Sequence, residues 1–170
     1  MKISLAGYMG SGKTSVGKDL AKKLNLVFLD LDELIKIQTA QTINEIFKNQ
    51  GEIKFRKIER EILLTTLNQE SNYVLALGGG TPAYYDNMKQ INEHTFSVYL
   101  RLSPMELTQR LYNERESRPL ISHLKKEDFP EFIGKHLFER RNFYEQAQFT
   151  IDVKSKTTKK IVSEIILQLP

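Results

Sequence analysis

The chain of 170 residues has the length of one ordinary domain; 40% of its residues are apolar, 27% are charged, and its net charge is +4. This composition supports a packed core and excludes a disordered, collagen-like or coiled-coil protein, while the lack of cysteine excludes disulfides and thiolate metal sites. No apolar run approaches the roughly 20 residues that span a bilayer, and the N-terminal apolar stretch is too short for a secretory signal. No window contains five or six consecutive basic residues, the pattern of a nucleic-acid-binding segment. We therefore expect a cytoplasmic protein that binds neither membranes nor nucleic acid.

Apolar runs of strand length alternate with amphipathic stretches of helical length along the whole chain. The predicted elements are, in order, strand 2–6, helix 13–24, strand 26–29, a helix that begins after Thr42 and is broken at Gly51, helix 52–68, strand 73–77, strand 96–100, helix 104–112, helix 130–147, strand 149–153 and helix 156–169. Two helix starts have the spacing of a capping box, Thr42 with Glu45 and Ser103 with Glu106. This alternation predicts βαβ units, a parallel sheet covered on both faces, and a three-layer α/β fold in one domain over residues 1–170.

The most specific motif comes directly after the first predicted strand. Residues 7–14 read Gly-Tyr-Met-Gly-Ser-Gly-Lys-Thr, a complete G-x-x-x-x-G-K-[ST] pattern between a strand and a helix. The glycines let successive backbone N–H groups face phosphate oxygens, and the following helix adds the positive end of its dipole. We expect Lys13 to reach the β- and γ-phosphates and the Thr14 hydroxyl to bind Mg²⁺, so the motif predicts a protein that binds a nucleoside triphosphate.

The residues after the P-loop helix indicate the class of P-loop protein. The N-K-x-D and D-x-x-G motifs of GTPases do not occur in the sequence, and force-transmitting ATPases need far more chain. The strand over 26–29 ends in Asp30, directly after the P-loop helix, where small-molecule kinases place their acceptor site. Asp30 and Asp32 are two residues apart, so in an extended segment both carboxylates face the same way and can share Mg²⁺ and acceptor binding. The alternative is that one of them is the N-cap of the next helix.

Several arginines surround these motifs in the sequence. Arg56 has Glu59 three residues later on the same predicted helix, a spacing at which the carboxylate can orient the guanidinium. Arg118 lies in a polar segment over about 113–124 that we expect to form a mobile lid, and Arg140 lies on the following helix. Since arginine grips carboxylates and phosphates bidentately, this set predicts an anionic acceptor and neutralisation of charge during phosphoryl transfer.

Together these residues resemble the shikimate kinase family. The matching segments cover nearly the whole chain: 7–14, Asp30 with Asp32, 42–47, 51–59, 78–80, 118–120, and Arg140 with Tyr144, Glu145 and Ala147. The resemblance implies phosphorylation of the 3-hydroxyl of shikimate by ATP in chorismate and aromatic amino-acid biosynthesis. It also implies the P-loop fold of nucleoside monophosphate kinases, a five-stranded sheet in the order 2-3-1-4-5, a requirement for Mg²⁺, and a monomer.

The resemblance further implies a role for each matching residue. Asp32 would hold the acceptor hydroxyls and act as base, Asp30 would reach Mg²⁺ through water beside Thr14, and catalysis would depend on Lys13, Asp32 and Arg118. The residues that would bind ATP are Gly10, Ser11, Gly12, Lys13, Thr14, Ser15, Arg110 and Arg118. The residues that would bind shikimate, several of them in a segment over about 31–60, are Asp32, Phe47, Phe55, Arg56, Gly78, Gly79, Gly80 and Arg140. The alternative for Phe47 and Phe55 is that they are simple core residues.

The chain departs from the family pattern at a few positions. Lys36 stands where the family usually has an acidic residue, Ala40 where it often has glycine, and the segment Arg141-Asn142-Phe143 lacks the common proline before the tyrosine. The spacing from Arg110 to Arg118 is one residue longer than usual. The three histidines, His94, His123 and His136, show no metal-ligand spacing, and we assign them no chemistry.

Two other functions are compatible with the same residues. The first is another small-molecule kinase of the same fold, such as a gluconate kinase, because carboxylate-binding arginines would suit gluconate too. The second is a nucleotide-binding switch that transfers no phosphoryl group. Only a kinase needs Asp32 for turnover, so the effect of Asp32→Asn on turnover separates an enzyme from a switch.

Overall fold

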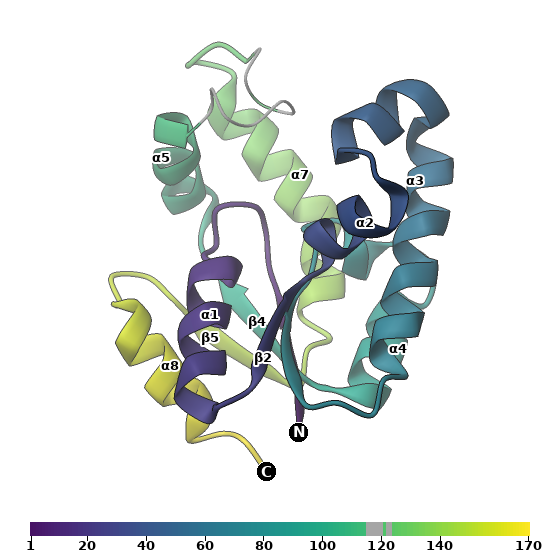
Figure 1. Ribbon diagram of the computed structural model, residues 1–170. Helices are drawn as coiled ribbons and strands as arrows, with labels where there is room; N and C mark the ends of the chain where they lie inside the picture. The colour runs from purple at the N-terminus through teal and green to yellow at the C-terminus, as the bar shows by residue number, and fades with distance from the viewer. Residues whose placement is uncertain (115–120, 122–123) are drawn as a thin grey trace.

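Five strands form one parallel sheet, as expected from the alternation of strands and helices. The computed structural model describes residues 1–114, 121 and 124–170. Its strands are β1 (Lys2–Ala6), β2 (Val27–Asp30), β3 (Tyr73–Ala76), β4 (Phe96–Arg101) and β5 (Phe149–Asp152). They lie in the order β2-β3-β1-β4-β5 (Figure 1), which confirms the order that the resemblance implied.

Helices cover both faces of this sheet. The helices are α1 (Lys13–Leu24), α2 (Leu31–Thr39), α3 (Ile43–Leu67), the 3₁₀ turn η1 (Thr81–Ala83), α4 (Asn87–His94), α5 (Pro104–Glu114), α7 (Phe129–Tyr144) and α8 (Thr158–Ile166). The first and last of them, α1 and α8, pack against each other on one face, whereas α3, α4 and α7 lie on the other (Figure 1). The prediction of a three-layer α/β fold is therefore confirmed.

Local signals in the sequence account for several element boundaries. The Thr42 hydroxyl accepts a hydrogen bond from the backbone N–H of Glu45, whose carboxylate accepts one from the N–H of Thr42 at 2.7 Å. Ser103 and Glu106 form the same reciprocal pair, so both predicted capping boxes are confirmed. At Gly51 the backbone has φ 78° and ψ 171°, which are not helical angles, so α3 consists of two helical segments that meet at a kink. The predicted break at Gly51 is therefore confirmed.

Three elements were not predicted, namely α2, η1 and α4. The helix α2 begins immediately at the end of β2, so no turn residues separate the two elements in the sequence. The helix α4 buries only Asn87, Met88 and Ile91, too narrow an apolar stripe to be recognised in a polar sequence. Both helices are also short, with 9 residues in α2 and 8 in α4, so each offers little more than two turns in which a period can be recognised.

The parallel arrangement brings the predicted motifs to one edge of the sheet. In the strand register Ala76 of β3 lies beside Leu5 of β1 and Asp30 of β2, so all three strands end at a similar level. The P-loop follows β1 and the glycine run follows β3 at that same edge, where α/β folds bind their ligands. A Cβ atom on Gly17 of α1 would lie 2.4 Å from the Phe28 ring of β2. Glycine therefore lets the P-loop helix pack close to the strand that carries Asp30.

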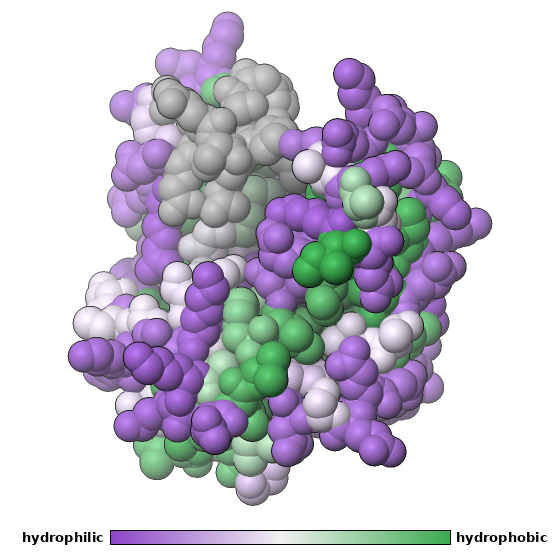
Figure 2. Space-filling model, in the orientation of Figure 1, coloured by the Kyte–Doolittle hydropathy of each residue, from purple (hydrophilic) through white to green (hydrophobic). Residues whose placement is uncertain are grey.

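The surface is polar over most of the face that Figure 2 shows. Apolar atoms gather on that face over β2, at the edge of the sheet, where Val27 is 59% exposed. Among the described residues, no helix combines the length and the apolar character that a membrane crossing requires.

Candidate active site

The loop between β1 and α1 forms a backbone cradle. Gly7, Gly10 and Gly12 have φ values of 146°, 77° and 95°, a range that residues with a side chain rarely adopt. Gly12 also caps α1, and it has no side chain that could occupy the first N–H groups of that helix. Those N–H groups and the positive end of the helix dipole therefore remain available to an anion.

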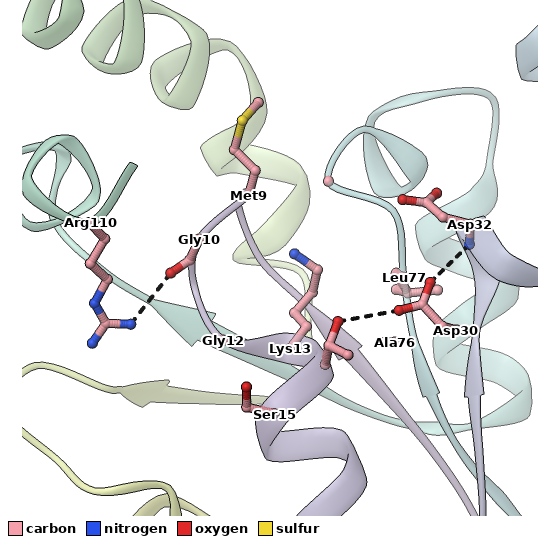
Figure 3. A pocket seen from close by; sticks show the side chains of 12 residues that line it. Met9, Gly10, Gly12, Lys13, Ser15, Asp30, Asp32, Ala76, Leu77 and Arg110 are labelled. Carbon is pink, nitrogen blue, oxygen red and sulfur yellow. Dashed lines mark hydrogen bonds between the residues drawn. The ribbon is translucent and has the colours of Figure 1, made fainter. Parts of the chain in front are cut away.

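Lys13 and Asp30 lie at the mouth of this cradle (Figure 3), and Thr14 lines the same cavity. The Lys13 ammonium donates hydrogen bonds to the carbonyl oxygens of Gly7 at 2.8 Å and Tyr8 at 3.0 Å. The Thr14 hydroxyl donates to Oδ2 of Asp30 at 3.2 Å. A hydroxyl and a carboxylate from two separate elements thus lie side by side, an all-oxygen pair suited to a hard cation such as Mg²⁺.

These groups line a cavity of about 500 Å³, which we call the P-loop cavity. Its lining residues are Met9, Gly10, Gly12, Lys13, Thr14, Ser15, Asp30, Asp32, Ala76, Leu77, Gly79 and Arg110. Arg110 also donates to the carbonyl oxygen of Gly10 at 3.4 Å (Figure 3), which places its guanidinium at the rim of the loop. Ser11 lies inside the loop with its hydroxyl buried, and it does not line the cavity.

The local structure at Asp30 and Asp32 differs from the extended segment that we expected. The helix α2 already begins at Leu31, so Asp30 is its N-cap and Asp32 lies in its first turn. Oδ1 of Asp30 accepts a hydrogen bond from the backbone N–H of Asp32 at 3.1 Å, which satisfies one of the free donors at the helix start. The prediction that Asp30 and Asp32 lie in one extended segment, with both carboxylates facing the same way, is therefore wrong. The alternative, an aspartate that is the N-cap of the next helix, holds for Asp30. Both residues nevertheless line the same cavity.

The environment of Asp32 favours its protonated form. Burial, followed by the nearby carboxylates of Asp30 and Glu59, raises the pKa of Asp32 from 3.8 to about 6, against the opposing effect of Lys13 and Lys36. A carboxylate with a pKa closer to neutrality is a stronger base than an ordinary aspartate and is still ionised at pH 7. Asp32 is therefore suited to accept a proton from a hydroxyl group.

A second cavity, of about 610 Å³, adjoins the first. It contains the two guanidinium groups of Arg56 and Arg140, and we call it the arginine cavity. The residues that line both cavities are Met9, Asp30, Asp32 and Gly79. The two spaces consequently meet at the carboxylate pair, with a phosphate-binding loop on one side and a site for an anion on the other.

Arg56 is held rigidly at the wall of the arginine cavity. Its Nη1 donates to Glu59 at 2.8 Å, as the spacing of the two residues predicted, and its guanidinium lies 4.0 Å from the centroid of the Tyr84 ring. A Cβ atom on Gly80 would lie 2.7 Å from Nη2 of Arg56, so only glycine permits this close approach. Among the described residues Nε of Arg56 is buried without a hydrogen-bond partner.

The other predicted site residues occupy different positions. Arg140 lines the arginine cavity. Gly78 lies next to Asp32, since a Cβ atom on Gly78 would be only 3.1 Å from Oδ1 of Asp32. Phe47 and Phe55 pack against each other with ring centroids 4.5 Å apart, and neither lines the two cavities. Arg118 and most of the predicted lid over 113–124 lie outside the described residues.

Some lining residues were not identified from the sequence. His136, to which we assigned no chemistry, lies in the arginine cavity with Tyr8 and Lys36. The signal that could have identified His136 is its position four residues before Arg140, since residues at that spacing share one helix face. Lys36 pairs with Glu33 on α2, and its charge acts on Asp32. Tyr144 donates a hydrogen bond to the carbonyl oxygen of Gly79 and so holds the glycine run in place.

Comparisons with known proteins agree with this geometry. A family model described as shikimate kinase matches residues 9–170. Among curated relatives, the shikimate kinase of Flavobacterium psychrophilum is 43% identical over 96% of both chains, and that of Flavobacterium johnsoniae is 41% identical over 97% of this chain and 96% of its own.

Solved structures give the same result. A shikimate kinase from Bacteroides thetaiotaomicron superposes with a TM-score of 0.92 at 35% identity over 99% of both chains. A shikimate kinase from Acinetobacter baumannii, solved in complex with shikimate, has a TM-score of 0.86 at 33% identity over 97% of this chain and 90% of its own. A gluconokinase from Sinorhizobium meliloti shares the fold alone, with a TM-score of 0.65 at 19% identity. The prediction of a kinase that uses ATP is confirmed, and at this identity over almost the whole chain the protein belongs to the shikimate kinase family.

Proposed function

We propose that this protein transfers the γ-phosphoryl group of ATP to the 3-hydroxyl group of shikimate, which gives shikimate 3-phosphate and ADP in aromatic amino-acid biosynthesis. The observation that carries the proposal is the meeting of the two cavities at Asp32. Phosphoryl transfer depends mainly on positioning a donor and an acceptor in line and on neutralising charge. A phosphate-binding loop and an anion-binding cavity that share one carboxylate meet both requirements.

In the P-loop cavity, ATP would bind through the backbone of Gly10, Ser11 and Gly12 and the side chains of Lys13, Thr14 and Ser15. Mg²⁺ fits the hydroxyl of Thr14 and the carboxylate of Asp30, whose oxygens lie 3.2 Å apart. Among the described residues, no three acidic or imidazole side chains gather into a closed metal site, so phosphate and water oxygens would complete the coordination. When bound, Mg²⁺ lowers the negative charge on the β- and γ-phosphates.

In the arginine cavity, Arg56 and Arg140 would hold the carboxylate of shikimate, and the backbone of Gly79 and Gly80 would contact the ring. Asp32 would orient the 3-hydroxyl and accept its proton as the oxygen attacks the γ-phosphorus. The Lys13 ammonium would then neutralise charge on the transferred group. The resemblance assigns the same task to Arg118 in the lid.

We also propose that the protein acts as a single-domain monomer in the cytoplasm. One sheet contains all five strands, and this supports a single domain over residues 1–170. A lid over about 113–124 that closes on ATP would exclude water and so protect ATP from hydrolysis.

The test is the release of ADP from Mg-ATP with shikimate, with gluconate and with no acceptor. We expect a large rate only with shikimate and a product phosphorylated on the 3-hydroxyl, as seen by ³¹P NMR. A rate that gluconate raises instead would favour the related sugar-acid kinases. A low rate unchanged by either acceptor, from protein shown to bind ATP, would contradict the acceptor assignment.

A further inference from the structure

His136 occupies a defined position in the arginine cavity that the proposed phosphoryl transfer does not use. It lies on α7 four residues before Arg140, and both side chains line that cavity. Nη1 of Arg140 donates to the backbone carbonyl oxygen of His136 at 3.2 Å. The histidine and the arginine therefore form one unit on a single helix face.

The imidazole ring of His136 is held from two sides. Its Nδ1 lies 2.7 Å from the hydroxyl of Tyr8, a P-loop residue that is only 2% exposed. The Tyr8 ring meets the imidazole edge-on with centroids 5.5 Å apart, and the Phe132 ring lies 5.3 Å away. These contacts hold the imidazole ring in one orientation. Because Nδ1 faces the Tyr8 hydroxyl and Nε2 lies on a different edge of the ring, Nε2 points away from Tyr8.

The protonation states depend on burial. Burial raises the pKa of the Tyr8 phenol well above its usual value, so the hydroxyl keeps its proton and can donate it to Nδ1. Burial, with a smaller effect from the charge of Arg140, lowers the pKa of His136 to about 4, so the ring is neutral at pH 7. A neutral imidazole that accepts at Nδ1 carries its proton on Nε2. The ring thus presents a neutral N–H donor.

We propose that the Nε2–H group of His136 donates a hydrogen bond to a hydroxyl oxygen of the bound acceptor, and that His136 is a specificity-determining residue of the arginine cavity. The cavity already contains Arg56, Arg140 and Lys36, whose charges suit a carboxylate. A neutral donor beside these cations suits an uncharged oxygen. A site built to bind a hydroxyl group discriminates strongly against an analogue that lacks it, because the buried donor is then left unpaired. This inference rests on the proposed function, since it requires an acceptor with both a carboxylate and several hydroxyls.

The first test compares His136→Leu with His136→Gln. Leucine fills the space without a donor, whereas glutamine keeps an N–H group at a similar reach. We expect His136→Leu to raise both KM and the calorimetric Kd for shikimate about tenfold, the factor that corresponds to one hydrogen bond of about 1.4 kcal/mol. The KM for ATP should not change, kcat should change less than KM, and His136→Gln should recover most of the loss.

The matched control is His94→Leu. His94 is also half-buried and bonded through Nδ1, to the carbonyl oxygen of Gln90 at 2.8 Å, but it lies on α4 outside the two cavities. We expect this control to retain the wild-type KM for shikimate. If His136→Leu does not fold, Tyr8→Phe is the second variant, since it removes the hydroxyl that orients the imidazole and should raise the same Kd by a smaller factor.

The second test uses shikimate analogues in which the 4- or the 5-hydroxyl is replaced by hydrogen. Wild-type protein should bind one of these analogues about tenfold more weakly than shikimate. The His136→Leu variant should bind that analogue and shikimate with the same Kd. Equal losses in wild type and variant for both analogues would overturn the inference, as would an unchanged Kd in His136→Leu. If wild-type protein binds ATP but neither binds nor phosphorylates shikimate, the proposed function fails and the inference fails with it. If wild-type protein phosphorylates shikimate and the His136 variants bind shikimate as tightly as wild-type protein does, only the inference fails.

Discussion

The hydroxyl of Thr14 donates a hydrogen bond of 3.2 Å to the carboxylate of Asp30, although the two residues are sixteen positions apart in the chain. Thr14 belongs to the first turn of the P-loop helix α1, and Asp30 is the last residue of β2. This bond connects the phosphate-binding loop to the edge of the sheet where α2 begins and where Asp32 lies in the first turn of that helix. It also brings together two of the ligands that we propose for Mg²⁺.

The first prediction concerns these metal ligands. Thr14→Val keeps the shape of the side chain but removes the hydroxyl, so the Mg²⁺ concentration that gives half-maximal rate should rise at least tenfold. Thr14→Ser retains the hydroxyl and is the matched control, with an expected change below threefold. The measurement is the initial rate at constant ATP over a Mg²⁺ titration. Identical titrations for the two variants would show that Thr14 does not bind the metal.

A second prediction concerns Asp32 as the base. Asp32→Asn preserves shape but cannot accept the proton, so kcat should fall by a factor on the order of 10² to 10⁴, the usual contribution of a general base. The calorimetric Kd for ATP should stay within about threefold of wild type. Asp19→Asn, an exposed change on α1, is the control and should leave kcat unchanged. Nearly full activity in Asp32→Asn would rule out Asp32 as the base.

A third prediction, on pH dependence, uses the raised pKa of the same residue. Asp32 acts in its ionised form and has a pKa of about 6 instead of 3.8, so kcat/KM should be level above pH 7 and should fall as the pH drops through 6. Below the pKa the fall should approach tenfold per pH unit. Because ATP also ionises, the direct measurement is a ¹³C NMR titration of the Asp32 carboxyl, assigned by its loss in Asp32→Asn. A titration midpoint near 4 would contradict this prediction.

A fourth prediction separates Arg140 from its neighbour. Arg140 lines the arginine cavity, whereas Arg141 is exposed and pairs with Glu145 on the protein surface. We expect Arg140→Met to raise the KM for shikimate by at least tenfold with a smaller effect on kcat, since the interaction acts mainly in substrate binding. Arg141→Met should stay within about twofold of wild type. Equal KM values for the two variants would argue against carboxylate binding by Arg140.

The fifth prediction uses two glycines. A Cβ atom on Gly80 would lie 2.7 Å from Nη2 of Arg56, so Gly80→Ala should displace the guanidinium and raise the KM for shikimate severalfold. On Gly134 of α7 a Cβ atom would meet nothing within 4 Å. Gly134→Ala should therefore leave KM unchanged and stabilise the helix by up to about 1 kcal/mol. Steady-state kinetics and urea unfolding measure the two effects, and an unchanged KM in Gly80→Ala would show that Arg56 tolerates displacement.

Short stretches of the sequence by themselves determined the P-loop, the helix starts and the fold class of this protein. The P-loop over residues 7–14 is a local pattern, because glycines at fixed positions permit the required backbone angles whatever surrounds them. The capping boxes at Thr42 and Ser103 involve residues three positions apart, and the alternation of strands and helices indicates a parallel sheet. The resemblance added the strand order, and the fold confirms it.

Only the tertiary structure decided how the side chains meet. Asp30 is a helix N-cap because α2 begins at once after β2, and the sequence left this role open as one of two alternatives for the aspartate pair. Tyr8 and His136 form a hydrogen bond although they are 128 positions apart. Such contacts depend on how the chain folds α7 back over the sheet edge, and no periodicity or spacing along the sequence contains that distance.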